Sequence, residues 1–319
     1  MPVPSDWSQR LKGFVDEWKR NSTAEEYIGD SPFDKFVLTE QAESWHDFLA
    51  WSNELQDSWS FRGQREAGWL LYTLLDRAVK RQHSTPTSSG YYHLDRGAEA
   101  RDLLFRFQQQ AHLYIRHLPS NEDLSSWFGL MQHHGVPTPF LDWTQSPYVA
   151  LYFALEQEPQ KEEKRSAVWA IDLDWLERKG RELLPSGVAT LLSNDPKTRA
   201  ERINSLLAQS LLAQSEEAVI INICPIKSNE RMAAQQGVSL CRLFQIASFS
   251  QTLMRMMVRP ETPDRPVVRK LEVKSNRRIE FLKNLRAMNI HRASLFPGLD
   301  GFGQSLRLDL ELKDNDAVL

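Results

Sequence analysis

The sequence predicts one α+β domain. Segments that favour β-strands stand at 58–63, 167–173, 218–224, 238–246 and 267–273. Apolar residues at helical spacing fill the stretches between them, and neither an internal repeat nor a separate linker is evident. One mixed or antiparallel β-sheet core, with a helical N-terminal extension and a helical insert, is therefore the simplest architecture.

The N-terminal region is predicted to be helical up to the first strand. Apolar residues recur there at helical spacing in two sets: Trp7, Leu11, Phe14, Val15 and Trp18, then Trp45, Phe48 and Leu49. SWSFRG at 58–63 is aromatic and ends in glycine, which indicates a strand that enters a turn. Pro, Gly and small hydroxyl residues at 83–90 predict a loop.

Prolines and glycines divide the middle of the chain. Apolar spacing predicts a helix over 98–118, and a further helix should end near Gly135 because Pro137 disfavours helical backbone before it. Pro147 suits the first position of a helix over 147–156.

The C-terminal half alternates strands with helices and loops. A Leu, Ala and Gln-rich helix is expected at 197–216, a proline-rich loop or lid at 257–267, and a basic helix at 275–289. LFPGLDG at 295–301 predicts a strand, a turn and a short helix that Asp300 caps.

Composition excludes several classes of protein. The 319 residues are 41% hydrophobic and 25% charged, which is typical of a globular fold. No apolar run approaches the roughly 20 residues that span a bilayer, so we expect a cytoplasmic protein without a membrane partner. Cys224 and Cys241 are too few for a disulfide framework or a four-cysteine zinc site.

Charge is distributed unevenly along the chain. Residues 1–60 hold 5 Lys/Arg and 12 Asp/Glu, a net of -7, whereas residues 255–292 hold 11 and 4, a net of +7. The basic segment either binds an acidic partner such as nucleic acid or pairs with the acidic N-terminal region. We favour pairing within the chain or simple solvation of these charges.

Standard catalytic and nucleotide-binding motifs are missing. The sequence has no GxxxxGK[ST], GxGxxG, HExxH or GxSxG. His133 and His134 are adjacent and should point in different directions on a helix, so no metal site is predicted. Two polar islands among aromatic residues remain, at 61–64 and at 132–153.

These islands carry a resemblance to the FRG domain family. The sequence has Phe-Arg-Gly at 61–63, HHGVPTPFLDWTQSPYVALYFA at 133–154, NERMAAQQG at 229–237 and LFPGLDG at 295–301. The resemblance implies a helical extension over 1–57, an FRG domain over 58–306 and a C-terminal tail over 307–319. The block order also resembles the ADP-ribosyltransferase fold, which implies a split sheet around an NAD site.

The resemblance to ADP-ribosyltransferases implies roles for particular residues. Arg62 would bind phosphate or ribose oxygens of NAD through its planar fork of donors. Thr144 and Ser146 would supply hydroxyls, and the start of the 147–156 helix would favour an anion. Tyr72, Tyr148 and Tyr152 would offer rings for stacking. The other expected NAD-binding residues are Gly63, Gln64, His133, His134 and Gln235.

Cleavage of the nicotinamide bond needs a carboxylate. The reaction passes through a cation-like sugar that a negative charge stabilises. Where the transferase pattern has a late glutamate, this chain has Gln235 and Gln236, with Glu230 upstream. Asp142 would replace that carboxylate, so the expected catalytic residues are Arg62, Asp142, Ser146 and Gln236.

The leading hypothesis is an enzyme that transfers ADP-ribose from NAD to a protein or nucleic-acid acceptor, as a toxin or anti-phage defence effector. Its further partner would be an antitoxin or regulator protein. The alternative hypothesis is a non-catalytic domain that senses a nucleotide or a nucleic-acid end through Arg62. Arg62 paired structurally with Asp142 would explain both islands without a ligand. A carboxylate beside Arg62 favours chemistry, whereas glutamines alone favour binding.

Overall fold

The computed structural model describes residues 7–21, 33–55, 58–82, 96–160, 164–184, 195–212, 218–223, 230–244, 247–258 and 262–314. The strands are β1 (Leu38–Ala42), β2 (Trp59–Gln64), β3 (Phe140–Thr144), β4 (Arg165–Asp172), β5 (Val219–Ile223), β6 (Gly237–Leu243) and β7 (Val268–Lys274). The first helices are α1 (Trp7–Asn21), α2 (Trp45–Glu54), α3 (Leu74–Gln82), α4 (Arg96–Ala111), α5 (Leu124–His133), α6 (Pro147–Leu155) and α7 (Leu173–Leu183). The later ones are α8 (Pro196–Leu212), α9 (Glu230–Ala234), α10 (Phe249–Val258), α11 (Arg278–Ala287), α12 (Arg292–Leu295) and α13 (Leu299–Asp314).

The seven strands form one mixed sheet in the order β1-β7-β4-β2-β3-β6-β5. Strands β1 and β7 are parallel, and every other neighbouring pair is antiparallel. Only one residue pair, Phe61 with Thr144, joins β2 to β3, whereas six pairs join β2 to β4. The α+β class and the mixed sheet are confirmed, and the sheet nearly divides between β2 and β3.

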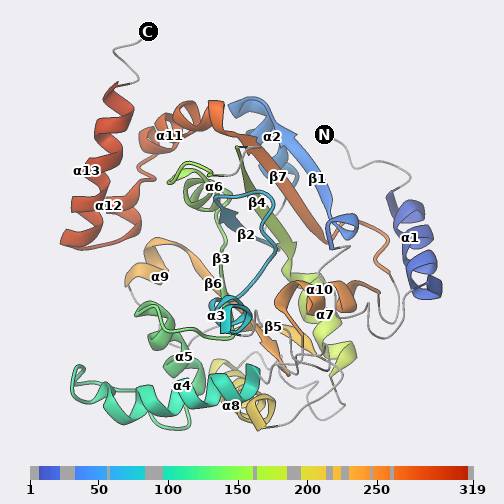
Figure 1. Cartoon of the computed structure of the whole chain (residues 1–319), viewed down its shortest axis with the longest axis vertical. Coiled ribbons are helices and arrows are strands. Elements are labelled where there is room, and N and C mark those ends of the chain that lie inside the picture. The colour runs from blue at the N-terminus through green and yellow to red at the C-terminus, as the bar shows by residue number, and fades with distance from the viewer. Residues whose placement is uncertain are drawn as a thin grey trace.

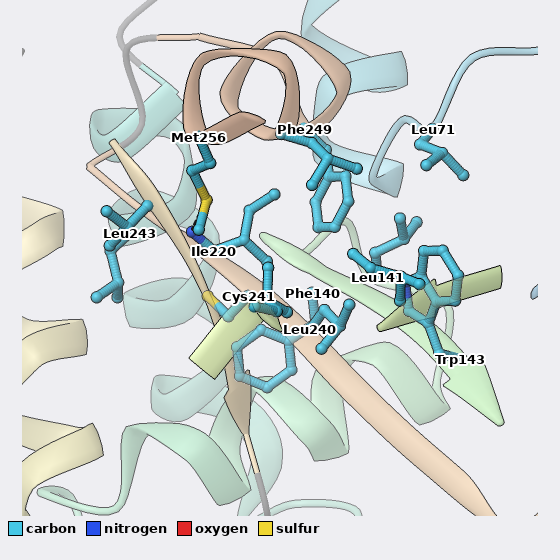
Figure 2. Packing of buried hydrophobic residues seen from close by; sticks show 14 of the residues in the cluster. Leu71, Phe140, Leu141, Trp143, Ile220, Leu240, Cys241, Leu243, Phe249 and Met256 are labelled. Carbon is cyan, nitrogen blue, oxygen red and sulfur yellow. Dashed lines mark hydrogen bonds between the residues drawn. The ribbon is translucent and has the colours of Figure 1, made fainter. Parts of the chain in front are cut away.

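Helices cover both faces of the sheet (Figure 1). On one face α2, α6 and α11 bury Phe48, Leu151 and Phe281 against β2, β4 and β7. On the other face α5 and α10 pack over β3, β5 and β6. Figure 2 shows Phe249 and Met256 of α10 pointing toward the sheet at Ile220.

Most expected elements are present, and a few bounds differ. Strands β2, β4, β5, β6 and β7, and helices α5, α6 and α8, are found close to their predicted bounds. The helix expected over 98–118 ends at Ala111. The strand expected in LFPGLDG is absent, because Leu295 ends helix α12 and α13 begins at Leu299. The loop predicted at 83–90 lies outside the described residues.

The N-terminal region is not only helical. Strand β1 lies in the sheet beside β7, with Leu38 opposite Arg269, so residues 38–42 belong to the core of the fold. At the other end, α13 runs across the boundary expected between 306 and 307. No described helix has both the length and the apolar content needed to cross a bilayer.

The basic segment pairs with the acidic N-terminal region. Arg269 forms ion pairs with Glu40 at 2.8 Å and with Glu54 at 2.9 Å, and Lys274 pairs with Glu43 at 2.7 Å. Pairing within the chain is thus confirmed for these two cations. The strand pairing of β1 with β7 brings these charges together, because it places Glu40 and Arg269 on adjacent strands.

Candidate functional site

The side chains of β2 point alternately to the two faces of the sheet, and this explains why the motif combines Phe, Arg and Gly. Successive side chains of a strand point to opposite faces of the sheet. Phe61 packs edge-on against Trp51 in the cluster beneath α6. Gly63 faces α6 as well, since a Cβ placed on it would lie 2.0 Å from the backbone oxygen of Ala150 and 2.5 Å from the backbone nitrogen of Ala154. Arg62 therefore points to the opposite face, and Gly63, which we expected to contact NAD, allows the close packing of α6 on β2.

Arg62 reaches across the gap between β2 and β3. One terminal N–H of its guanidinium donates to the backbone oxygen of Asp142 on β3, while its Nε, which is buried, has no acceptor among the described residues. Burial lowers the pKa of Arg62 to about 10, the charge of Asp142 opposes that shift, and Arg77 adds to it. The guanidinium stays positively charged at neutral pH and keeps donors that Asp142 does not use.

The Asp142 carboxylate lies at the surface and is held in place by its neighbours. The side-chain amide of Gln132, near the end of α5, donates to Oδ1 of Asp142. The Thr138 hydroxyl donates to the amide oxygen of Gln132, which fixes the orientation of that amide. Asp142 thus presents a positioned negative charge beside Arg62, as the chemical hypothesis requires.

Thr144 and Ser146 make structural hydrogen bonds at the end of β3. The Thr144 hydroxyl donates to the backbone oxygen of Gln235 at 2.7 Å and accepts from the backbone N–H of Ser146 at 3.0 Å. The Ser146 side chain accepts from the backbone N–H of Val149 and so caps α6. Ser146 therefore has a capping role and already satisfies the Val149 N–H, one of the free N–H groups at the start of the helix where we expected an anion.

The third and fourth sequence blocks meet beside Asp142. The Gln235 amide donates to the backbone oxygen of Leu295 at 3.0 Å. Arg231 of α9 and Arg292 of α12 both lie over the ring of Phe296, at 4.5 and 4.3 Å from its centroid. Burial lowers the pKa of Arg231, and the charge of Asp142 opposes that shift. No role was expected for Arg231, although it lies in the NERMAAQQG block.

His133 and His134 lie at the exposed end of α5. Their rings meet edge-on, with centroids 5.0 Å apart. Burial lowers the pKa of His133 below its usual value, and the charges of His134 and Arg231 lower it further. His133 is therefore neutral at pH 7 and lies on the Arg231 side of the site.

Gln236 and Glu230 do not approach Arg62 through any described contact. Gln236 adopts a left-handed backbone with φ of 48°, its backbone oxygen accepts from the N–H of Gln145, and its side chain is exposed. Glu230 begins α9 and is exposed. Of the acids that we considered, Asp142 is the one that the structure places beside Arg62.

The remaining expected residues have other surroundings. Gln64 is buried, donates to the backbone oxygen of Leu70 and accepts from the Trp169 indole at 2.8 Å. Tyr152 is buried on the α6 face, away from Arg62, and donates to Glu156 at 3.1 Å. Tyr148 packs against Trp45 and Phe48 on that same face. Tyr72 is half-buried in the segment that precedes α3. Neither Tyr148 nor Tyr152 is placed to stack on a ligand of Arg62.

Sequence analysis also missed a buried ionic cluster. Arg242 of β6 is fully buried and pairs with Asp76 of α3 at 3.0 Å, and Arg96 of α4 pairs with the same carboxylate oxygen at 3.1 Å. The other oxygen of Asp76 accepts the backbone N–H groups of Thr73 and Phe249. These contacts connect α3, α4 and α10 to strand β6. No pattern in the sequence around these residues predicted the ion pairs.

Comparisons with known proteins support the family assignment alone. In the described part of the chain, no group of three or more His, Cys, Asp or Glu is placed to hold a metal ion. No curated protein and no solved structure matches the chain. The sequence model of the FRG domain matches residues 57–163, which include the first two blocks, Arg62 and Asp142. The chain therefore carries an FRG domain over residues 57–163.

Proposed function

We propose that this chain is an ADP-ribosyltransferase-like enzyme that cleaves NAD and transfers ADP-ribose to a protein or nucleic-acid acceptor. The observation that carries the proposal is the placement of a fixed carboxylate, Asp142, next to a guanidinium with unused donors, Arg62. Both lie at the point where β2 and β3 separate after a single residue pair. NAD requires that combination, because it carries a pyrophosphate and reacts through a cation-like sugar.

The proposed roles follow from the charges. Arg62 binds pyrophosphate or ribose oxygens of the substrate NAD, and Arg231 adds a second positive charge near Asp142. When the C–N bond breaks, its electron pair leaves with neutral nicotinamide, and the Asp142 carboxylate stabilises the positive charge that develops on the ribose. The acceptor atom then forms the new bond to the ribose and loses its proton to solvent.

Two substitutions separate binding from chemistry. Because Arg62 bonds to the backbone oxygen of Asp142, Asp142→Asn should leave Arg62 in place and remove only the charge. We expect this variant to bind NAD normally and to release nicotinamide about a hundredfold more slowly or worse. Arg62→Ala should lose about 2 kcal/mol or more of NAD binding free energy while it stays folded. Asp174→Asn and Arg181→Ala change exposed residues of α7 and are the matched controls.

The measurements are nicotinamide release by chromatography and NAD binding by calorimetry. A wild-type protein that neither binds nor cleaves NAD would refute the proposal. A wild-type protein that binds NAD or another nucleotide through Arg62, yet releases no nicotinamide, would support the non-catalytic sensing function. That second candidate is favoured by one observation, the buried Nε of Arg62 that has no acceptor among the described residues and is free to bind an anion.

A further inference from the structure

Helix α13 is apolar on two opposite faces. Its inner face buries Leu312 and half-buries Leu308, and ion pairs from Glu311 to Arg278 and from Asp309 to Arg286 hold it against α11. Its outer face carries four residues that are between 47% and 83% exposed: Leu299, Phe302, Leu306 and Leu310. Their spacing of three, four and four residues places them in one stripe. A helix that is apolar on both sides is normally covered on both.

Gly303 lies within this outer stripe, and no contact among the described residues requires a glycine there. A Cβ added to it would meet nothing within 4 Å, and its φ is not in the left-handed region. Glycine in a helix interior costs about 1 kcal/mol relative to alanine. A glycine at such a position lets a second helix approach closely, as small residues do in other helix pairs.

The charges beside the stripe are complementary to a second copy of the same helix. Asp300 and Arg307 are exposed, and neither has a partner among the described residues. They are seven residues, or two turns, apart and so lie on the same flank. If two α13 helices pair antiparallel about a twofold axis between Gly303 and Gln304, Asp300 of each copy faces Arg307 of the other.

We propose that α13 forms a twofold, antiparallel helix pair with α13 of a second copy of this chain. In this register Leu306 packs between Leu299 and Phe302 of the second copy, and the two Gly303 residues lie near the axis. Figure 1 shows α13 at the edge of the molecule, where a second copy has access. Sixteen residues give a contact about 24 Å long, which is at the small end of specific interfaces, so we expect a weak dimer whose population depends on concentration.

Sedimentation velocity over a concentration series tests this arrangement. Leu306→Glu should leave only monomer, while Leu212→Glu, which changes an exposed leucine of α8, should leave the dimer affinity unchanged. Gly303→Gln should weaken the dimer without lowering the thermal stability of the monomer, because a Cβ at this position meets no atom of the described residues within 4 Å.

A charge exchange tests the register itself. Asp300→Arg and Arg307→Asp should each weaken the dimer about tenfold, because each creates two like-charge pairs across the axis. The double variant D300R/R307D should restore the wild-type affinity. A chain that stays monomeric at every concentration, a dimer that tolerates Leu306→Glu, or a double variant that is no better than the single ones would overturn the proposal.

Discussion

Replacement of Gly63 by alanine should destabilise the fold without a direct effect on the site. The added Cβ would lie 2.0 Å from the backbone oxygen of Ala150, whereas ordinary contacts begin at 3.4 Å, so α6 and β2 must separate by more than 1 Å. The three atoms nearest the new Cβ are backbone atoms of α6, so no side-chain rotation relieves the clash. Overpacking of a core costs about 1–3 kcal/mol, and a clash with backbone belongs at the upper end, at about 3 kcal/mol.

Urea denaturation measures this loss, and Gly129 supplies the control. Gly129 lies inside α5 with nothing within 4 Å of an added Cβ. Gly129→Ala should therefore stabilise the protein by up to about 1 kcal/mol, because alanine favours the helix. If Gly63→Ala unfolds at the wild-type urea concentration, or stays stable and loses ligand binding instead, the packing explanation of this glycine is wrong.

Three further outcomes are expected. Asp76→Asn should cost about 3–5 kcal/mol at neutral pH, because it leaves the buried Arg242 without its charge partner. Desolvation raises the pKa of Asp76 in the folded protein, but the ion pairs with Arg242 and Arg96 outweigh it, so the folded pKa is lowered. The stabilisation is therefore present above pH 3.8 and is lost as the pH falls through the folded pKa. Urea denaturation across that pH range should show a flatter profile for the variant, and equal profiles would contradict the assignment. Thr144→Val should cost about 1–3 kcal/mol in the same assay, because it leaves the Gln235 carbonyl and the Ser146 N–H unpaired, and an unchanged stability would argue against these bonds. Labelled RNA and DNA should bind weakly or not at all at low salt, because eight of the eleven basic residues in 255–292 are already in ion pairs within the described part of the chain. Tight binding that falls steeply with salt would contradict this.

The sequence predicted strand β2 and pointed to Arg62, Gly63 and Ser146, but it did not give the structural role of each residue. It offered an ion pair between Arg62 and Asp142 as one interpretation, whereas the structure has Arg62 donating to the backbone oxygen of Asp142. It treated Gly63 as a ligand contact because the close approach of α6 depends on packing between segments nearly ninety residues apart. Ser146 precedes a proline and caps a helix, a role that its position next to Pro147 already indicated.

Strand β1 and the ion pair between Asp76 and Arg242 could not be predicted from the residues around them. Strand β1, LTEQA, is an edge strand with alternating exposure and a polar sequence, so it lacks the apolar signal of the inner strands. The pair between Asp76 and Arg242 joins residues 166 positions apart, and neither residue looks unusual in its own segment. Long-range pairing of charges has no periodicity that a single sequence could reveal.

The strand order limits how the chain can be shortened. Residues 57–163, the portion that the FRG domain model matches, contain β2 and β3, whose contact is a single residue pair. The main neighbour of β2 is β4, which begins at Arg165, and the main neighbour of β3 is β6, which begins at Gly237. A fragment that ends at 163 would thus hold two strands without their ladders and would not fold autonomously. During translation, both β4 and β6 must leave the ribosome before Arg62 and Asp142 can take their final geometry, because these strands hold β2 and β3 in the sheet.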